Sequence, residues 1–244
     1  MSYGLNTRPF HKPLRPIALR TDLIAERHTR LHMIPACDSR SETDYIIRDD
    51  MDDEIACTVT GKKFGGQPGR EFRDKSGLPL FELHQKSIVF KQPWTVRLPG
   101  CGDKDLVTTQ LRRTFRDFGN GNCDLMFENA AAIQNKHTRE KMMKLQTYRR
   151  QSMLYAFDVL DGDRKVVEVQ ESVQKNEKLA LMPESRKGYH PILDIRVAPG
   201  VDLTLVRFLI PYKDAADLCR LVLLPLSCRI GCMGYEELNA IDND

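Results

Sequence analysis

The sequence lacks the motifs of the common enzyme chemistries. It contains no G-x-S-x-G nucleophile elbow, no P-loop, no G-x-G-x-x-G fingerprint and no H-E-x-x-H metal motif. Cys228 and Cys232 stand four apart, but no second C-x-x-C pair accompanies them, and zinc sites normally need four ligands. His84 and His190 lie in strand-like surroundings and are interpreted as surface or hydrogen-bonded sheet residues rather than bases. The sequence therefore predicts no enzyme, no metal site and no cofactor.

Long apolar runs are also absent. The closest approach, residues 218–233, is broken by Pro225 and two arginines, whereas a membrane-spanning helix needs about 18 to 20 apolar residues. The first twenty residues lack the apolar core of a signal peptide. The seven cysteines are odd in number and show no pairing pattern, which fits reduced thiols. These absences predict a cytoplasmic protein that meets membranes only at their surface.

Charge is nearly balanced overall but uneven along the chain. The net charge of +3 is too small to indicate a nucleic-acid partner. Residues 1–30 carry six basic and two acidic side chains, whereas residues 38–54 carry eight acidic and two basic ones. Because residues 1–54 also hold four prolines and little apolar periodicity, they are interpreted as an extended leader that ends in an acidic linker.

From residue 55 to residue 197, apolar and polar residues alternate as in half-buried antiparallel strands. The clearest examples are WTVRL, YAFDV and LDIRV, at 94–98, 155–159 and 193–197. Turn residues separate such runs, with Asp74 and Gly77 in one place and Asp161-Gly162 in another. The glycine-rich stretch KKFGGQPGR is interpreted as a wide hairpin loop. Many short strands spaced by turns predict a sandwich or barrel.

The periodicity changes after Pro199-Gly200. Residues 201–210 are almost entirely apolar, and on a helical wheel only Thr204 and Arg207 share a narrow polar strip. A helix with so little polar surface is buried on several sides, and the inside of a closed barrel offers such a place. The predicted fold is therefore mainly β, a closed antiparallel barrel around a central hydrophobic C-terminal helix.

Five residues define that predicted helix. A carboxylate in the first turn accepts hydrogen bonds from free N–H groups and favours the helix dipole. An unpaired buried guanidinium is very costly, so the arginine is expected to face a carboxylate or the barrel mouth. The helix residues are Asp202, Leu205, Val206, Arg207 and Leu209.

Two segments resemble the LURP-one-related family. Residues 57–96 resemble its N-terminal half, with a D-x-x-G-x-P-L-F hairpin and a tryptophan one strand later. Residues 189–209, YHPILDIRVAPGVDLTLVRFL, resemble its C-terminal signature, in which V-A-P-G-V-D precedes an apolar helix. The phrases PFHKPLRPIAL and LMFENAA are similar to those of fungal members. The chain departs from the family pattern at Arg207, in mid-helix, and at Pro211, which ends the helix.

The resemblance implies the Tubby C-terminal-like fold, a closed antiparallel barrel of about twelve strands threaded by a central hydrophobic helix. It implies no catalytic activity. Because the superfamily includes phosphoinositide-binding tubby proteins and phospholipid scramblases, it makes an anionic phospholipid the expected ligand, although fold kinship alone does not transfer a function. The domains expected are a leader and linker at 1–54, the barrel with its helix at 55–212, and a divergent tail at 213–244.

Basic side chains are the candidate lipid contacts. If helical, residues 137–150 would present Met142, Met143 and Leu145 on one side and cations on the other, as at a membrane surface. The alternative, which we favour from the sequence, is a solvated loop whose cations balance the acidic linker. The candidate contacts are Lys62, Lys63 and Arg70 beside the glycine-rich loop, and Lys141, Lys144, Arg149 and Arg150 in the basic run.

Three functions stay open at this point. The first is a non-catalytic barrel that binds anionic phospholipid or phosphoinositide. The second is a protein-interaction scaffold that uses the leader, the acidic linker and the tail. The third is a transcription-related role of the tubby type. It has the least support, because the basic residues are not interleaved with aromatic ones and no recognition helix stands out.

Overall fold

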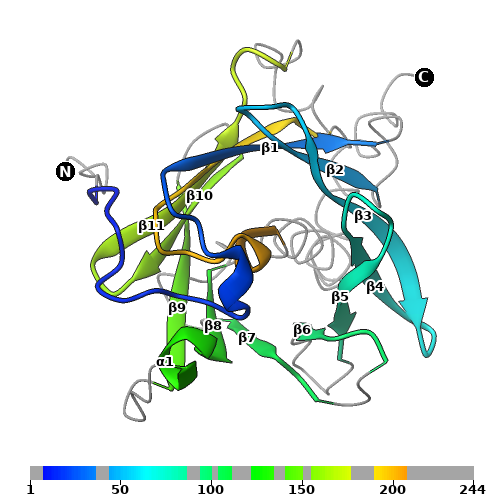
Figure 1. The fold of residues 1–244 in the computed structure, drawn as a ribbon. Helices are drawn as coiled ribbons and strands as arrows, with labels where there is room; N and C mark the ends of the chain where they lie inside the picture. Colours follow the sequence, from blue (N-terminus) through cyan, green and yellow to red (C-terminus); the bar gives the residue numbers. More distant parts are fainter. Residues whose placement is uncertain are drawn as a thin grey trace, which may run out of the picture.

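A closed barrel of antiparallel strands forms the body of the structure, a computed structural model (Figure 1). The structure describes residues 8–36, 44–86, 94–100, 104–111, 122–134, 141–150, 155–176 and 190–207. Within these ranges, twelve strands follow one another around the barrel, and β1 closes it by pairing with β12. The strands are β1 (Thr29–Pro35), β2 (Tyr45–Asp49), β3 (Ile55–Phe64), β4 (Gln67–Arg73), β5 (Pro79–Gln85), β6 (Trp94–Arg97), β7 (Val107–Leu111), β8 (Cys123–Glu128), β9 (Met142–Arg149), β10 (Ala156–Asp161), β11 (Arg164–Glu171) and β12 (Leu193–Val197).

The connections alternate between two ends of the barrel, because each strand runs antiparallel to the one before it. The connections β2–β3, β4–β5, β6–β7, β8–β9 and β10–β11 share one end, where the chain also leaves β12. We call this the leader end, because the residues before β1 cross it, drawn in blue in Figure 1. The short helices η1 (Thr21–Leu23) and α1 (Ala130–Gln134) lie in this region. The opposite end is called the far end.

Alternating side chains fill the barrel, as the sequence predicts. Leu193, Ile195 and Val197 of β12 are buried, and so are Trp94 and Val96 of β6. They belong to one core cluster with residues of the other strands. Removing these alternating apolar side chains from water is the main force that closes the sheet on itself.

The predicted turns are present, although one is tighter than expected. Asp74 Oδ1 accepts hydrogen bonds from the backbone N–H groups of Ser76 and Leu78, at 2.8 and 3.0 Å, and Gly77 has a φ of 85°. The glycine-rich stretch is not a wide loop. Phe64 pairs with Gln67, which leaves only Gly65-Gly66 in the turn, and both glycines have positive φ, as a two-residue hairpin requires.

The structure differs from the expected leader and linker over residues 29–35 and 45–49. These residues form β1 and β2, which are barrel strands. The apolar residues Leu31, Met33, Tyr45 and Ile47 point into the core, but each alternation is short and interrupted by charged residues. The described part of the acidic linker, residues 44–54, is thus mainly a strand followed by a turn.

The basic run also differs from both expectations, since it is neither helix nor loop. Residues 142–149 form β9, in which Met143, Leu145 and Thr147 are buried while Met142 and Lys144 are exposed. The period of the apolar residues in this run is two, and pairing with β8 and β10 on either side satisfies the strand backbone.

The predicted helix begins inside the ring of strands. Residues 203–207 are helical, and Figure 1 shows this segment, in orange, within the barrel opening. Leu205 and Val206 are fully buried and join the same core cluster as the strand residues. Leu209 and the expected tail at 213–244 lie outside the described residues.

Candidate functional site

The leader end is held together by one buried carboxylate. Asp202 is the N-cap of the helical segment, and its Oδ1 accepts a hydrogen bond from the Thr204 N–H at 2.7 Å. Its Oδ2 accepts hydrogen bonds from the N–H groups of Leu19 and Arg20, both at 2.8 Å. Burial raises the pKa of Asp202 above its ordinary value. The helix-starting role was predicted, whereas the bonds to the leader were not.

Asn129 makes a second junction between the leader and the barrel. Its Oδ1 accepts a hydrogen bond from the Ala18 N–H at 3.0 Å, and its Nδ2 donates one to the Pro16 carbonyl at 2.9 Å. The Ala130 N–H donates to the Ala18 carbonyl at 2.8 Å, which joins the first residue of α1 to the leader. The leader is therefore part of the folded surface at this end.

Exposed apolar side chains gather at the leader end. Among the described residues, six large apolar side chains are exposed, and five of them belong to connections or segments at this end. We call these five the apolar rim: Leu14 in the leader, Met51 between β2 and β3, Leu78 between β4 and β5, Ile133 in α1 and Met142 at the start of β9, with exposures from 48% to 79%. The sixth, Val173, is 67% exposed and follows β11 at the far end.

Three members of the apolar rim lie on neighbouring segments. The Arg15 guanidinium donates hydrogen bonds to the sulfur of Met143 at 3.2 and 3.3 Å. This contact holds the leader segment that carries Leu14 beside the start of β9, which carries Met142. The leader is also bonded to α1, the helix of Ile133, through Ala18. Exposed cations stand close by: Lys12 in the leader and Lys141 beside Met142.

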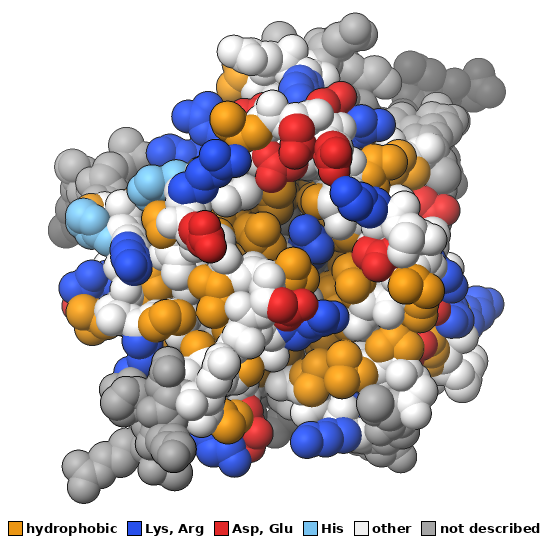
Figure 2. Space-filling model, in the orientation of Figure 1, with side chains coloured by type: hydrophobic (Ala, Val, Ile, Leu, Met, Phe, Trp, Pro, Cys, Tyr) orange, Lys and Arg blue, Asp and Glu red, His pale blue; other side chains and the backbone are white. Residues whose placement is uncertain are grey.

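Figure 2 views the molecule from the leader end. Apolar and basic side chains interleave over this face around a hollowed centre, and acidic ones gather toward the top of the view. One acidic segment of this end is the β2–β3 turn, in which Met51 is flanked by Asp49, Asp50, Asp52 and Asp53. The leader end is thus apolar and mixed in charge, not uniformly basic.

Most of the seven predicted cations face carboxylates. The Nζ of Lys62 lies 2.8 Å from Glu71 Oε1, and the Lys62 and Arg73 side chains hold the pKa of Glu71 below its ordinary value. Lys141 lies 3.1 Å from Glu128, and Lys144 lies 2.8 Å from Asp124. The nearest approach of Arg150 to Glu168 is 3.3 Å.

The structure does not bring the seven cations onto one surface. Lys62 and Lys63 precede the β3–β4 turn at the far end. Arg149, the last residue of β9, and Arg150, which follows it, also lie at the far end. Lys141 is at the leader end. Arg70 is inside the barrel, only 5% exposed, with its guanidinium 5.3 Å from the centre of the Tyr45 ring.

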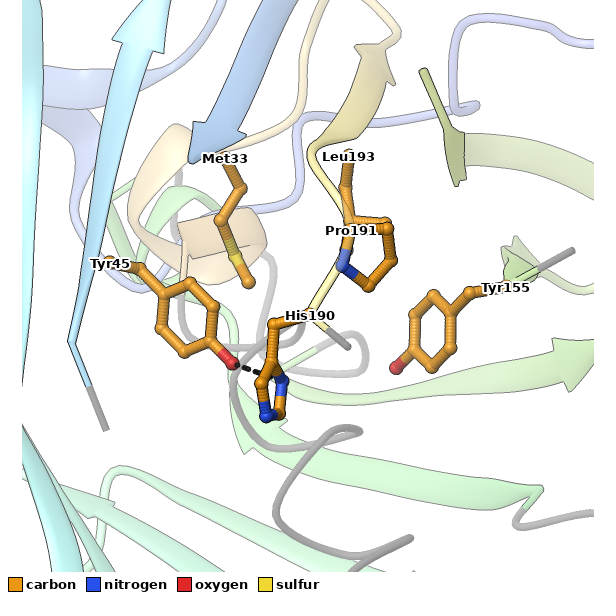
Figure 3. A pocket seen from close by; sticks show the side chains of 6 residues that line it. All are labelled: Met33, Tyr45, Tyr155, His190, Pro191 and Leu193. Atoms are coloured by element: carbon orange, nitrogen blue, oxygen red, sulfur yellow. Dashed lines mark hydrogen bonds between the residues drawn. The ribbon is translucent and has the colours of Figure 1, made fainter. Parts of the chain in front are cut away.

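A small cavity lies at the far end (Figure 3). Its lining residues are Met33, Tyr45, Tyr155, His190, Pro191 and Leu193. A hydrogen bond of 3.3 Å joins the Tyr45 hydroxyl and His190 Nδ1. The volume of about 20 Å³ is enough for one water molecule. His190 is therefore a hydrogen-bond partner of a buried tyrosine, and it lies before β12 rather than within a strand.

Arg207 is largely buried at the start of the helix, with 7% of its surface exposed. Its Nε is buried without a hydrogen-bond partner, and no described carboxylate pairs with it. Its charge acts on Cys57, a thiol whose pKa burial raises to about 11.

The described residues contain no group of three or more His, Cys, Asp or Glu side chains that could hold a metal ion. In the same part of the chain, no helix has the length and apolar character needed to cross a bilayer.

The fold and the sequence together place the chain among known proteins. The LURP-one-related family model matches residues 29–210. The chain belongs to the LURP-one-related family. The match begins at the first residue of β1, so the family unit includes the two strands that lie within the expected leader and linker.

A solved structure shares the barrel of this LURP-one-related protein. The X-ray structure of a protein from Arabidopsis thaliana aligns with a TM-score of 0.50 over 83% of this chain and 99% of that chain, at 15% sequence identity. At this identity the likeness shows the fold alone. None of the curated proteins matches this chain in sequence.

Proposed function

We propose that this LURP-one-related barrel is a non-catalytic protein that binds anionic phospholipid at a membrane surface, with its leader end facing the bilayer. The observation that carries this proposal is the apolar rim: among the described residues, five of six exposed large apolar side chains share that end. Apolar side chains that gather on one face of a soluble domain are typical of interaction and membrane surfaces.

Apolar insertion contributes more to this binding than charge does. Complete burial of one such side chain is worth about 1.5 to 3 kcal/mol, whereas a cation near an anionic leaflet contributes about 1 kcal/mol. The cations Lys12 and Lys141 stand beside Leu14 and Met142, but the acidic turn around Met51 opposes an anionic surface. The anionic headgroup therefore adds to the affinity, and insertion of Leu14, Ile133 and Met142 supplies most of it.

The proposal redistributes the predicted lipid contacts. Lys141 keeps its role, because it lies beside Met142 at the leader end, and Lys144 follows it on β9. Lys62, Lys63, Arg149 and Arg150 belong to the far end and are expected to contribute little, and Arg70 points into the core. The leader does not support the alternative of a protein-interaction scaffold, because described leader residues are hydrogen-bonded to the barrel.

Vesicle co-sedimentation tests the proposal. The full chain is mixed with phosphatidylcholine vesicles that either contain or lack phosphatidylserine or phosphatidylinositol bisphosphate. The double variant Leu14→Glu, Met142→Glu is expected to lower the partition coefficient at least about tenfold, since two buried apolar groups are lost. The matched control is Val173→Glu, which makes the same change at the far end.

Each outcome decides the proposal. Loss of binding in the rim variant with retention in Val173→Glu supports it, and stronger binding to anionic than to neutral vesicles supports the headgroup class. Equal binding of the wild type, the rim variant and the Val173 variant contradicts the proposed orientation. The absence of any binding to anionic vesicles contradicts the proposed function itself.

A further inference from the structure

His32 joins three segments at the place where the sheet closes. It lies on β1 and points to the outer wall, since its neighbours Leu31 and Met33 point into the core, yet only 8% of its surface is exposed. Its Nδ1 lies 2.9 Å from Asp194 Oδ1 on β12, and its Nε2 lies 2.5 Å from Asp50 Oδ1 in the β2–β3 turn. The ring therefore bridges the seam between the first and last strands and ties the acidic turn to it.

The two contacts of His32 require a proton on each ring nitrogen. An ionised carboxylate only accepts hydrogen bonds, and a neutral imidazole has one N–H donor and one acceptor nitrogen. Hydrogen bonding from His32 holds the pKa of the Asp50 carboxyl below its ordinary value, so this partner is ionised near neutral pH. Both contacts therefore describe an imidazolium, a positive charge held between two carboxylates.

Other charged groups surround the ring on every element packed against it. They are Arg30 on β1 itself, Arg48 on β2, the acidic residues 49–54 of the β2–β3 turn, Asp194 and Arg196 on β12, and Lys175 after β11, whose charge acts on Asp50. Two of these cations contact carboxylates of their own. Arg48 Nη1 lies 3.3 Å from Asp53 Oδ2, and Arg196 Nη1 lies 3.0 Å from Glu168 Oε2. The cation in direct contact with both carboxylates at the ring is thus His32.

Loss of the proton is expected to move the turn rather than the strand. Once the ring is neutral, one nitrogen lone pair faces a carboxylate oxygen at 2.5 or 2.9 Å, which is a repulsive contact. Asp194 is fixed in mid-strand, because β12 pairs there with β1 on one side and with β11 on the other. Asp50 follows β2 in a turn, and its side chain is 35% exposed. The remaining proton therefore stays on Nδ1, and Asp50 separates from Nε2.

We propose that His32 is a proton-dependent latch that ties the acidic β2–β3 turn to the seam of the barrel. The charged ring stabilises the closed arrangement, so the tie is present while the ring is protonated. It is lost as the pH rises through the range in which the imidazolium gives up its proton. In stronger acid it is lost again, as the pH falls through the lowered pKa of Asp50.

The latch makes docking of the leader end pH-dependent, a consequence that rests on the proposed function. Met51 of the apolar rim directly follows Asp50 in the turn. The imidazolium offsets one negative charge of a turn that opposes an anionic leaflet, and the tie holds Met51 in place. Binding to anionic vesicles is therefore expected to weaken as the ring loses its proton.

Nitrogen-15 NMR of the imidazole rings tests the latch in the full wild-type chain, because it distinguishes the doubly protonated ring from each neutral tautomer. Over a titration from about pH 5 to about pH 9, His32 is expected to change from the imidazolium to the Nδ1–H tautomer. His84, which contacts one carboxylate through Nε2 at 2.8 Å from Glu82, is the internal comparison and should take the Nε2–H form. A His32 ring that does not change its protonation over this range, or that becomes the Nε2–H tautomer, overturns the latch.

Hydrogen exchange measures the response of the turn. Protection factors, which correct for the intrinsic pH dependence of exchange, are expected to fall at least about fivefold at residues 50–54 between the two ends of the titration. Those at residues 76–78 should stay constant, because Asp74 holds that turn without a histidine. His32→Gln keeps a hydrogen-bond donor but does not titrate, so it should remove the pH dependence, whereas the matched control His84→Gln should keep it. An unchanged pH dependence in His32→Gln contradicts the latch, and if that variant does not fold, the wild-type NMR titration decides.

Vesicle co-sedimentation at the same two pH values separates the latch from the proposed function. The wild type is expected to bind phosphatidylserine-containing vesicles about fivefold more tightly at the acidic end, the effect of one charge near an anionic leaflet, and His32→Gln should show a smaller change. Equal pH dependence in both proteins overturns the effect of the latch on docking. Absence of binding at both pH values contradicts the proposed function, while the NMR and exchange results still decide the latch.

Discussion

The two ends of the barrel differ in how they are closed. At the leader end, Asp202 and Asn129 hold the leader across the opening through hydrogen bonds to backbone groups, and apolar side chains protrude around it. At the far end, a small apolar cavity is spanned by one side-chain hydrogen bond between Tyr45 and His190. Among the described residues, the leader end is thus a platform held by backbone hydrogen bonds with an apolar surface, whereas the far end shows a small cavity beside a side-chain hydrogen bond.

The largest expected effect comes from removing the carboxylate that closes the leader end. Asp202→Ala leaves the N–H groups of Leu19, Arg20 and Thr204 without their acceptor, and the free energy of unfolding should fall by roughly 3 to 4 kcal/mol. Urea denaturation of the two proteins measures the difference.

The far-end counterpart is Tyr45→Phe, which removes one hydrogen bond of 3.3 Å to His190. Its cost is expected to be about 1 kcal/mol or less. If Tyr45→Phe destabilises the protein as much as Asp202→Ala does, the two ends do not differ as described.

An intermediate effect is expected where the helix enters the core. Arg207→Met should raise the free energy of unfolding by about 1 to 3 kcal/mol, because an apolar side chain of similar length replaces an unpaired buried charge. The same denaturation experiment detects the gain. A loss of several kcal/mol would instead show that Arg207 has a charge partner within the chain.

A small, pH-dependent effect is expected on the barrel wall between the two ends. Hydrogen bonding from Lys62, with a contribution from Arg73, holds the pKa of Glu71 below its ordinary value of 4.5. Because the pKa is lowered in the folded state, the stabilisation is present above about pH 4.5 and is lost as the pH falls through the folded-state pKa.

The variant Glu71→Gln tests this role. It should lower the free energy of unfolding by about 1 kcal/mol at pH 7 and by less in acid. Denaturation midpoints measured between neutral and acidic pH give the curve for each protein. A constant difference between variant and wild type across this range would contradict the assigned role of Glu71.

Much of the fold was predictable because local pattern and tertiary environment agree. The alternation in β12 is matched by its burial, whereas in β6 and β10 the predicted inward residues are buried and the residues between them are largely buried as well. Asp74 and Gly77 define a turn by their own chemistry, and Asp202 marks the helix start. In each case the signal lies within a few residues of the structure that it specifies.

The missed strands had weaker or ambiguous local signals. In β1 and β2 the apolar residues alternate over only two or three positions between charged side chains, and pairing with β12 and β3 decides their structure. In β9 the sequence MMKLQTYR carries a period of two, but its cations favoured a membrane helix or a solvated loop in the sequence interpretation. Long-range pairing overrides such local preference.

The candidate sites depend on contacts between residues that are far apart in the sequence. Leu14, Ile133 and Met142 come together only because the leader bonds to α1 and to the start of β9. The cost of burying Arg207 was predictable from its position on the helix, but whether a carboxylate lies beside it depends on every segment that faces it. For the same reason, the seven cations could not be divided between the two ends before the topology was known.

Hydrogen exchange in the presence and absence of anionic vesicles tests the docking surface most directly. Amide protection should increase in residues 12–16, 130–134 and 141–143 at the leader end and stay unchanged in residues 172–176 at the far end, since only buried contacts slow local opening. Protection that rises at 172–176 while the three leader-end segments remain unchanged would contradict the account.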